Sequence, residues 1–370
     1  MKRKIVFFSL IAVLLALPLV ACAEPTPAPV PAPAPKPAPA PKPAPAPAKA
    51  KAEAPAEVIT LTMDTAADGT YVTNPYPRFQ KWVEQATGGR IKIKTTVEML
   101  DDPMIGAVEG RVDIGYQRQA WSAGTFPLWD ISTFPFFWND SHEYEAAMWD
   151  PRLVSIFDKS YGEAGLVRMF EGPSGAMEII YSNKKYPTLQ SLQGAKLRAA
   201  SMTIVWSMQM AGLAPLRMPP SELIDAVRLG TVDGIHTNRA YGMEIGLIDV
   251  VKYGSLWPFS SDFMQVFIMN KDKFDSLPAD LQSILKDVFL EMNGQSFVGG
   301  HEARLVAISA FRSTNVEIIT PEKAEIDKVV SLLVPGLFDK WVENAGPQAA
   351  EVLSILTEYA TGPAAVALRK

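Results

Sequence analysis

The spacing of apolar residues predicts an α/β chain from about residue 57 onward. Phe79, Val83 and Ala86 fall on one helical face, and the glycine pair that follows them predicts the end of that helix. Along residues 91–97 apolar or β-branched side chains alternate with lysine and threonine, which is typical of a half-buried strand.

The same reading predicts four more elements. Residues 58–63, 112–116 and 196–199 are expected to form strands, and 102–109 a short helix that stops at Gly110. Strands that alternate with helices favour largely parallel sheets, in which ligands bind at the carboxyl ends of the strands.

One stretch of sequence occurs twice. Residues 107–113 read AVEGRVD and residues 226–233 read AVRLGTVD, so each is a helix end, a glycine and a strand that carries Val-Asp. Two such units about 120 residues apart suggest two lobes that are built alike. Chance is the alternative, because a helix, a glycine and a strand often follow one another.

The N-terminal 56 residues have a different composition from the rest. A basic start, an apolar run over 5–17 and small residues before Cys22 predict a secretory signal peptide over 1–21, and the run is too short to span a membrane. Cys22 is the only cysteine among 370 residues. Its place after a Leu-x-Ala tripeptide resembles a bacterial lipobox, so we expect Cys22 to be lipidated; an ordinary signal peptide with an incidental cysteine is the alternative. The Pro/Ala-rich residues 22–56 predict an extended tether.

Charge and motifs argue against several classes of protein. The net charge of −5 is spread along the chain, and no basic stripe indicates nucleic-acid binding. A single cysteine and three scattered histidines match no familiar metal motif, and the sequence has neither GxGxxG nor a Walker loop. Residues 172–175 (GPSG) do not form a nucleophile elbow, because the glycine is one place early. We therefore expect a binding protein rather than an enzyme, with no metal or cofactor.

Six motifs occur in a consistent order between residues 58 and 300. They are GRVDIG at 110–115, FPFF at 134–137, LQGAKLR at 192–198, GLAP at 212–215, MPPSE at 218–222 and GTVDG at 230–234. In this order they resemble the solute-binding proteins of tripartite ATP-independent periplasmic (TRAP) transporters, of the dicarboxylate- and sialate-binding kind.

The resemblance implies an α/β fold of the two-lobed periplasmic-binding-protein type, with a hinge and a ligand cleft between the lobes. Lobe I is expected to comprise 57–175 and 263–302, and lobe II 176–262 and 303–370. The implied function is extracytoplasmic: the protein captures a small carboxylate or zwitterionic ligand by lobe closure and delivers it to one small and one large membrane subunit. Two alternatives stay open, a binding lipoprotein of an ATP-driven importer and a sensory solute-binding module.

Arg198 is the first candidate for ligand contact. It ends the predicted strand 196–199, where a guanidinium can hold a carboxylate through two parallel hydrogen bonds. The resemblance implies that the matching arginine holds the ligand's carboxylate. Glu178 occupies a position where many members carry a second arginine. It either meets an amine, which favours a zwitterionic ligand, or pairs with Arg168 or Arg118.

The remaining candidates rest on weaker signals. Thr237 stands where many members have asparagine, and Asn238 follows it. Side chains near predicted strand ends or loops, or aromatic enough for an apolar wall, complete the predicted site: Tyr71, Tyr116, Arg118, Trp121, Trp206 and Trp257. An aromatic residue in such a place lies more often in the core than in a pocket.

Overall fold

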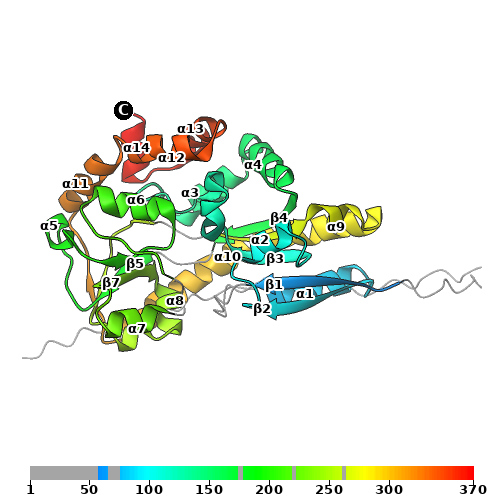
Figure 1. Ribbon diagram of the computed structural model, residues 1–370, viewed down its shortest axis with the longest axis horizontal. Helices are drawn as coiled ribbons and strands as arrows, with labels where there is room; N and C mark the ends of the chain where they lie inside the picture. The colour runs from blue at the N-terminus through cyan, green and yellow to red at the C-terminus, as the bar shows by residue number, and fades with distance from the viewer. Residues whose placement is uncertain (1–56, 66–75, 174–177, 219–221, 261–263) are drawn as a thin grey trace, which may run out of the picture. The chain divides into compact units, whose positions relative to one another are not determined.

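The computed structural model describes residues 57–65, 76–173, 178–218, 222–260 and 264–370 (Figure 1). All of them belong to one compact unit that spans Pro55–Lys370. The expected signal peptide, Cys22, the tether and Tyr71 lie outside the described residues.

The first of two five-stranded sheets has the order β2-β1-β3-β9-β4. Its strands are β1 (Ile59–Thr65), β2 (Ile91–Val97), β3 (Ile114–Arg118), β4 (Leu166–Pro173) and β9 (Met264–Asn270). Helix α1 (Tyr76–Ala86) packs on β2 and on α10 (Ala279–Arg312), and α2 (Pro103–Val108) packs on β3. A core of apolar residues from β1, β3, β9, α1 and α10 holds these layers together.

The second sheet has the order β10-β8-β5-β7-β6. Its strands are β5 (Glu178–Ser182), β6 (Leu197–Arg198), β7 (Gly234–Asn238), β8 (Tyr253–Ser255) and β10 (Glu317–Ile319). The strands of the first sheet all fall in the ranges assigned to lobe I, and those of the second in the ranges assigned to lobe II. The exact lobe boundaries stay a prediction.

The sheets are mixed rather than largely parallel, so that expectation was wrong. Strand β1 runs parallel to β2 and β3, but β9 runs antiparallel to both β3 and β4, and β5 runs antiparallel to β7 and β8. The connections β4–β5 and β8–β9 each lead from one sheet to the other, so β5 and β9 pair with strands that are distant in sequence and lie antiparallel to them.

The repeated stretch of sequence has a repeated structure. Both copies end a helix, α2 or α7 (Leu223–Arg228), and pass through a glycine with positive φ, 69° at Gly110 and 71° at Gly230. Asp113 then accepts from the backbone N–H of Thr62 at 2.7 Å, and Asp233 accepts from that of Lys196 at 2.9 Å. Each aspartate thus fixes a parallel strand pair in register, so the likeness in sequence corresponds to a likeness in structure.

The other helices complete the layers around the two sheets. They are α3 (Ser141–Met148), α4 (Pro151–Glu163), α5 (Leu189–Leu192), α6 (Met202–Met210), α8 (Arg239–Glu244), α9 (Lys271–Asp275), α11 (Lys323–Leu333), α12 (Leu337–Ala345), α13 (Ala349–Tyr359) and α14 (Pro363–Leu368), with short 3₁₀ turns η1 (Gln119–Gly124), η2 (Pro127–Trp129) and η4 (Leu247–Asp249). Helix α12 contacts both α6 and η2, while α13 contacts α3 and α4.

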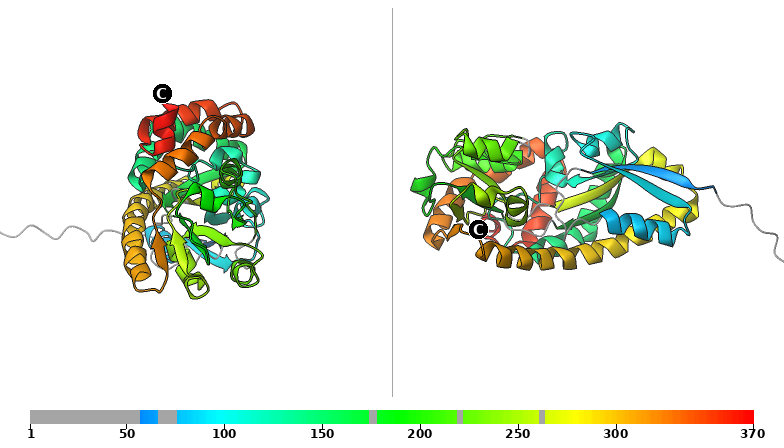
Figure 2. Two further views of the ribbon diagram at one scale, coloured as in Figure 1. Left: turned by 90° about the vertical axis from the view of Figure 1, so that its left-hand side faces the viewer. Right: turned by 90° about the horizontal axis from the view of Figure 1, so that it is seen from below.

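Helix α10 links elements of both sheets. Its 34 residues extend about 50 Å at 1.5 Å per residue. It contacts α1 and β4 of the first sheet and α8, which follows β7 of the second (Figure 2). Among the described residues no helix is both long and apolar enough to cross a membrane.

Candidate ligand-binding site

Three candidate residues meet at one edge of the second sheet. Strand β5 runs antiparallel to β7, and its first residue, Glu178, lies opposite Asn238, the last residue of β7. Strand β6 runs parallel to β7, so Arg198 at its end approaches the same edge, opposite Ile235. Because β5 runs antiparallel to β7, its first residue, Glu178, lies near the carboxyl ends of β6 and β7.

Arg198 is a buried guanidinium with unused donors. Its residue is 5% exposed, one Nη donates to the carbonyl of His236 at 3.4 Å, and Nε has no hydrogen-bond partner among the described residues. Burial lowers the pKa of Arg198 to about 10, and the negative charge of Glu178 opposes this shift. The group stays protonated at neutral pH, so it can clasp a carboxylate.

The nearest ionisable side chain to Glu178 is that of His236, a residue that no sequence motif marked. The Glu178 Oε2 and His236 Nδ1 atoms lie 2.9 Å apart and both side chains are fully buried. Their orientation is not that of a hydrogen bond, and neither carboxylate oxygen has another partner in the described part of the chain. Pairing with Arg168 was one expected alternative and is not found, because Arg168 contacts Asp158 and Glu171 at 2.9 Å.

Arg118 brings the first sheet into the site. It ends β3, is 6% exposed, and its charge lowers the pKa of Arg198 as a smaller effect after burial. An electrostatic effect of this kind requires the two guanidinium groups to be within range of each other. The ring of Trp121 has its centroid 6.0 Å from the Arg118 Cζ. The predicted residues Arg118, Trp121 and Arg198 therefore share one region.

Thr237, Asn238 and Tyr116 are buried close to strand ends, and their polar atoms are engaged to different degrees. The Asn238 Oδ1 accepts from the backbone N–H of Tyr241 at 2.7 Å and caps α8. The hydroxyl of Tyr116 donates to Gln265, and its ring stacks on Phe267 at 4.2 Å. Tyr116 is thus part of the first sheet's core, whereas Asn238 caps the helix that follows β7.

Two predicted tryptophans have packing partners of their own. Trp257 is fully buried, and its indole N–H donates to the carbonyl of Tyr186 at 2.7 Å. Trp206 lies on α6, where the Lys340 ammonium is 4.6 Å from the ring centroid and comes from α12. Both positions fit packing between layers, and a contact of either residue with ligand stays an untested prediction.

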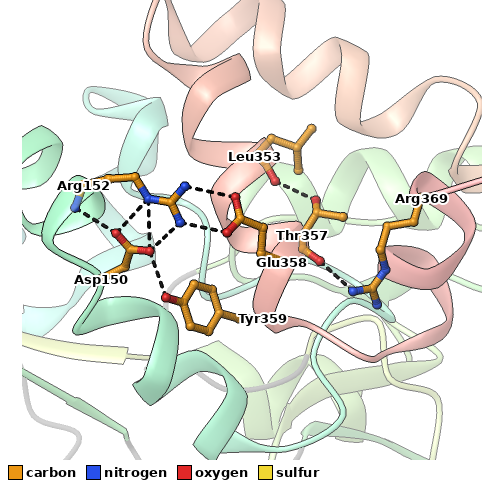
Figure 3. Close-up of polar contacts among 7 residues, drawn as sticks. All are labelled: Asp150, Arg152, Leu353, Thr357, Glu358, Tyr359 and Arg369. Atoms are coloured by element: carbon orange, nitrogen blue, oxygen red, sulfur yellow. Dashed lines mark hydrogen bonds and ion pairs between the residues drawn. The ribbon is translucent and has the colours of Figure 1, made fainter.

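A surface hollow of about 490 Å³ among α12, α13 and α14 has a different character. Arg369 donates to the carbonyls of Thr357 and Ala360 and so caps the end of α13. Near this hollow, Arg152 bridges Asp150 and Glu358 (Figure 3). The charged groups here are engaged with one another, whereas Arg198 Nε and both Glu178 carboxylate oxygens have no hydrogen-bond partner among the described residues, so the chemistry favours the sheet edge.

Two mixed sheets, each with a buried arginine at a strand end, are the arrangement expected of a two-lobed binding protein. Comparison with known proteins agrees with this class. A model of the bacterial extracellular solute-binding proteins, family 7, matches residues 63–337. The chain belongs to this family, which confirms the solute-binding family expected from the six motifs, and the family is one of extracytoplasmic receptors.

The chain is similar to relatives of known structure over almost their whole length. The Bordetella pertussis extracytoplasmic solute receptor DctP7, which binds pyroglutamic acid, is 21% identical, with a TM-score of 0.74 over 81% of this chain and 99% of that one. A TRAP solute-binding protein from Desulfovibrio salexigens with bound orotic acid is 19% identical, with a TM-score of 0.73 over 81% and 98%. The protein YiiZ of Salmonella typhimurium is 22% identical, over 70% of this chain and 80% of its own. The likenesses to the two solved structures establish the two-lobed fold.

Proposed function

We propose that the protein captures a small carboxylate-bearing solute outside the cytoplasm and hands it unchanged to the membrane subunits of a TRAP transporter. The supporting observation is the buried, protonated guanidinium of Arg198, which has donors to spare in a member of a solute-binding family. Relatives of the same fold bind pyroglutamate, orotate, pyruvate or gulonate, all of them carboxylates.

Lobe closure supplies the affinity in this proposal. Arg198 ends a strand of the second sheet and Arg118 a strand of the first, so one anion placed between them contacts both lobes. A ligand shifts the equilibrium toward the closed form by as much as its contacts in that form exceed those in the open form. The bound anion also offsets the repulsion between the two guanidinium groups.

The lipid anchor and the transporter are further parts of the proposal. Acylation of Cys22 holds the receptor at a membrane surface, and the Pro/Ala-rich tether gives the globule reach. Delivery to TRAP subunits predicts uptake that an imposed ion gradient drives without ATP. Reconstituting the receptor with the membrane proteins encoded beside it tests this, and a strict requirement for ATP would contradict it.

Substitution of Arg198 tests the binding site. Removing one member of a buried charged pair costs about 2–5 kcal/mol, so Arg198→Ala should weaken binding roughly 30- to 4,000-fold. Arg198→Lys keeps the charge but loses the two-pronged geometry, and it should fall between wild type and alanine. Calorimetric titration of small carboxylates measures both. Arg78→Ala, an exposed position on α1, is the matched control. A folded Arg198→Ala protein that binds within about threefold of wild type would place the carboxylate elsewhere, with Arg118 as the next candidate.

A further inference from the structure

The carboxylate of Glu178 is buried beside the proposed anion site. Its side chain is 0% exposed, and neither oxygen forms a hydrogen bond with any described residue. A buried charged group without hydrogen bonds is unfavourable unless a partner satisfies it. Both oxygens can therefore still accept from an N–H or O–H donor outside the described residues, and a bound ligand can supply one.

His236 fixes where that carboxylate points. Across the β5–β7 pair, Glu178 lies opposite Asn238 and Ile180 opposite His236, so Glu178 and His236 project from the same face of the sheet. The imidazole Nδ1 is 2.9 Å from Oε2, and the ring meets Phe259 edge-on with centroids 6.3 Å apart. One carboxylate oxygen thus faces the imidazole, while Oε1 remains available.

Arg198 is coupled to the same pair. Its Nη donates to the His236 carbonyl, and the charge of Glu178 favours the protonated guanidinium. An acid that binds Arg198 consequently brings its carboxylate close to a second, fixed carboxylate. The like charges repel each other unless the ligand places a hydrogen-bond donor against Glu178.

We propose that Glu178, positioned by His236, selects acids that carry an N–H donor next to the carbon bearing their carboxylate. Amino acids, cyclic imino acids and lactam acids meet this requirement, and simple dicarboxylates do not. Glu178 is the specificity-determining residue and His236 its positioning residue. The inference rests on the proposed role of Arg198 in holding the ligand's carboxylate.

Matched ring acids test the N–H requirement directly. L-Pyroglutamate and 5-oxotetrahydrofuran-2-carboxylate differ only in a ring N–H against a ring oxygen. L-Proline and tetrahydrofuran-2-carboxylate form a second pair, in which the ring nitrogen is a cationic ammonium and adds a charge as well as a donor. Calorimetric titration uses the full chain with Cys22→Ser, which removes the acylation site. In at least one pair the N–H acid should bind roughly 10- to 150-fold more tightly, because a hydrogen bond to a charged acceptor is lost in the other.

Variants separate selection from folding. Glu178→Leu should bring the affinity ratio within a pair to about threefold or less. His236→Leu should also lower this ratio. His236→Gln should give a ratio between those of His236→Leu and wild type, because glutamine offers a donor to Glu178. A purely structural defect weakens both members of a pair alike and leaves their ratio unchanged. His142→Leu, at a side chain that is 69% exposed on α3, is the matched control and should leave the ratio as in wild type.

The outcomes distinguish this inference from the proposed function. Equal binding within both pairs, or tight binding of succinate or pyruvate with none of the ring acids, overturns the role of Glu178 while leaving Arg198 as the carboxylate site. An unchanged ratio in both Glu178→Leu and His236→Leu also overturns it. Failure of wild type to bind any of these six acids overturns the inference, whereas the proposed function is judged by the separate titration of Arg198→Ala with other small carboxylates.

Discussion

Asp130 holds the start of α6, the helix that follows the Arg198 strand. This residue is 2% exposed and follows η2. Its Oδ2 accepts from the backbone N–H of Thr203 at 3.2 Å and from the Thr203 hydroxyl at 2.6 Å, while Oδ1 accepts from Thr133. The Thr133 hydroxyl lies 3.1 Å from that of Ser201. A buried acid thus joins the segment after β3 to the helix beside the proposed site.

Burial raises the pKa of Asp130 from 3.8 to about 6, although the hydrogen bonds from Thr133 and Thr203 oppose the shift. The folded state therefore binds an extra proton between about pH 4 and pH 6. The contribution of Asp130 to the free energy of unfolding falls as the pH rises through this window, and it is constant above the window. A shift of about two units corresponds to roughly 3 kcal/mol.

Asp130→Asn removes this ionisation. Asparagine is neutral at every pH. Its side-chain NH2 replaces one accepting carboxylate oxygen with a donor, so the Thr133 hydroxyl must reorient, and this lowers the free energy of unfolding by about 1 kcal/mol. The variant should be about 1–2 kcal/mol more stable than wild type at pH 7.5, and no more stable than wild type at pH 4. Urea unfolding of both proteins with Cys22→Ser, measured from pH 4 to pH 8, gives the comparison. Parallel pH profiles, or a variant less stable than wild type at pH 7.5, would refute the reasoning.

Three further outcomes are expected. Asp150→Asn should show the opposite pH response: hydrogen bonds from Arg152 lower the pKa of Asp150, so its stabilisation is present at neutral pH and is lost as the pH falls below about 4. A variant as stable as wild type in urea at pH 7 would contradict this. Cys22→Ser should move the protein from the membrane to the soluble fraction, as fractionation and immunoblotting would show. Deleting residues 27–47 should leave ligand affinity and melting temperature unchanged, and a loss of either would mean that the segment packs on the globule.

Local side-chain chemistry made several elements predictable from the sequence. Asp102 caps α2 by accepting from the backbone N–H groups of Met104 and Ile105. Gly88 and Gly89 end the first helix with φ of 61° and 79°, values that cost glycine little. The repeated Val-Asp was visible for the same reason, because each copy combines a capping glycine with an aspartate that bonds the neighbouring strand. These signals lie within a few residues of the features they specify.

The candidate site was only partly predictable. Arg198 was identifiable because its strand and its motif are continuous in the sequence. The partner of Glu178 was not, because His236 is 58 residues away and the two meet only through the register of β5 on β7. Trp257 and Tyr116 could be placed in the core only when their hydrogen bonds to Tyr186 and Gln265 were known.

Sheet direction was also decided by tertiary structure. The alternation of strands and helices is a local pattern and says nothing of a strand such as β9, which returns between β3 and β4 after nearly a hundred residues. Apolar periodicity specifies which face of a strand is buried, but not which strand it pairs with or in which direction. Pairing depends on the chain entropy and packing of the whole domain. The sequence by itself therefore determined several local elements and the place of Arg198 at a strand end, while the tertiary structure decided which charged groups surround that arginine.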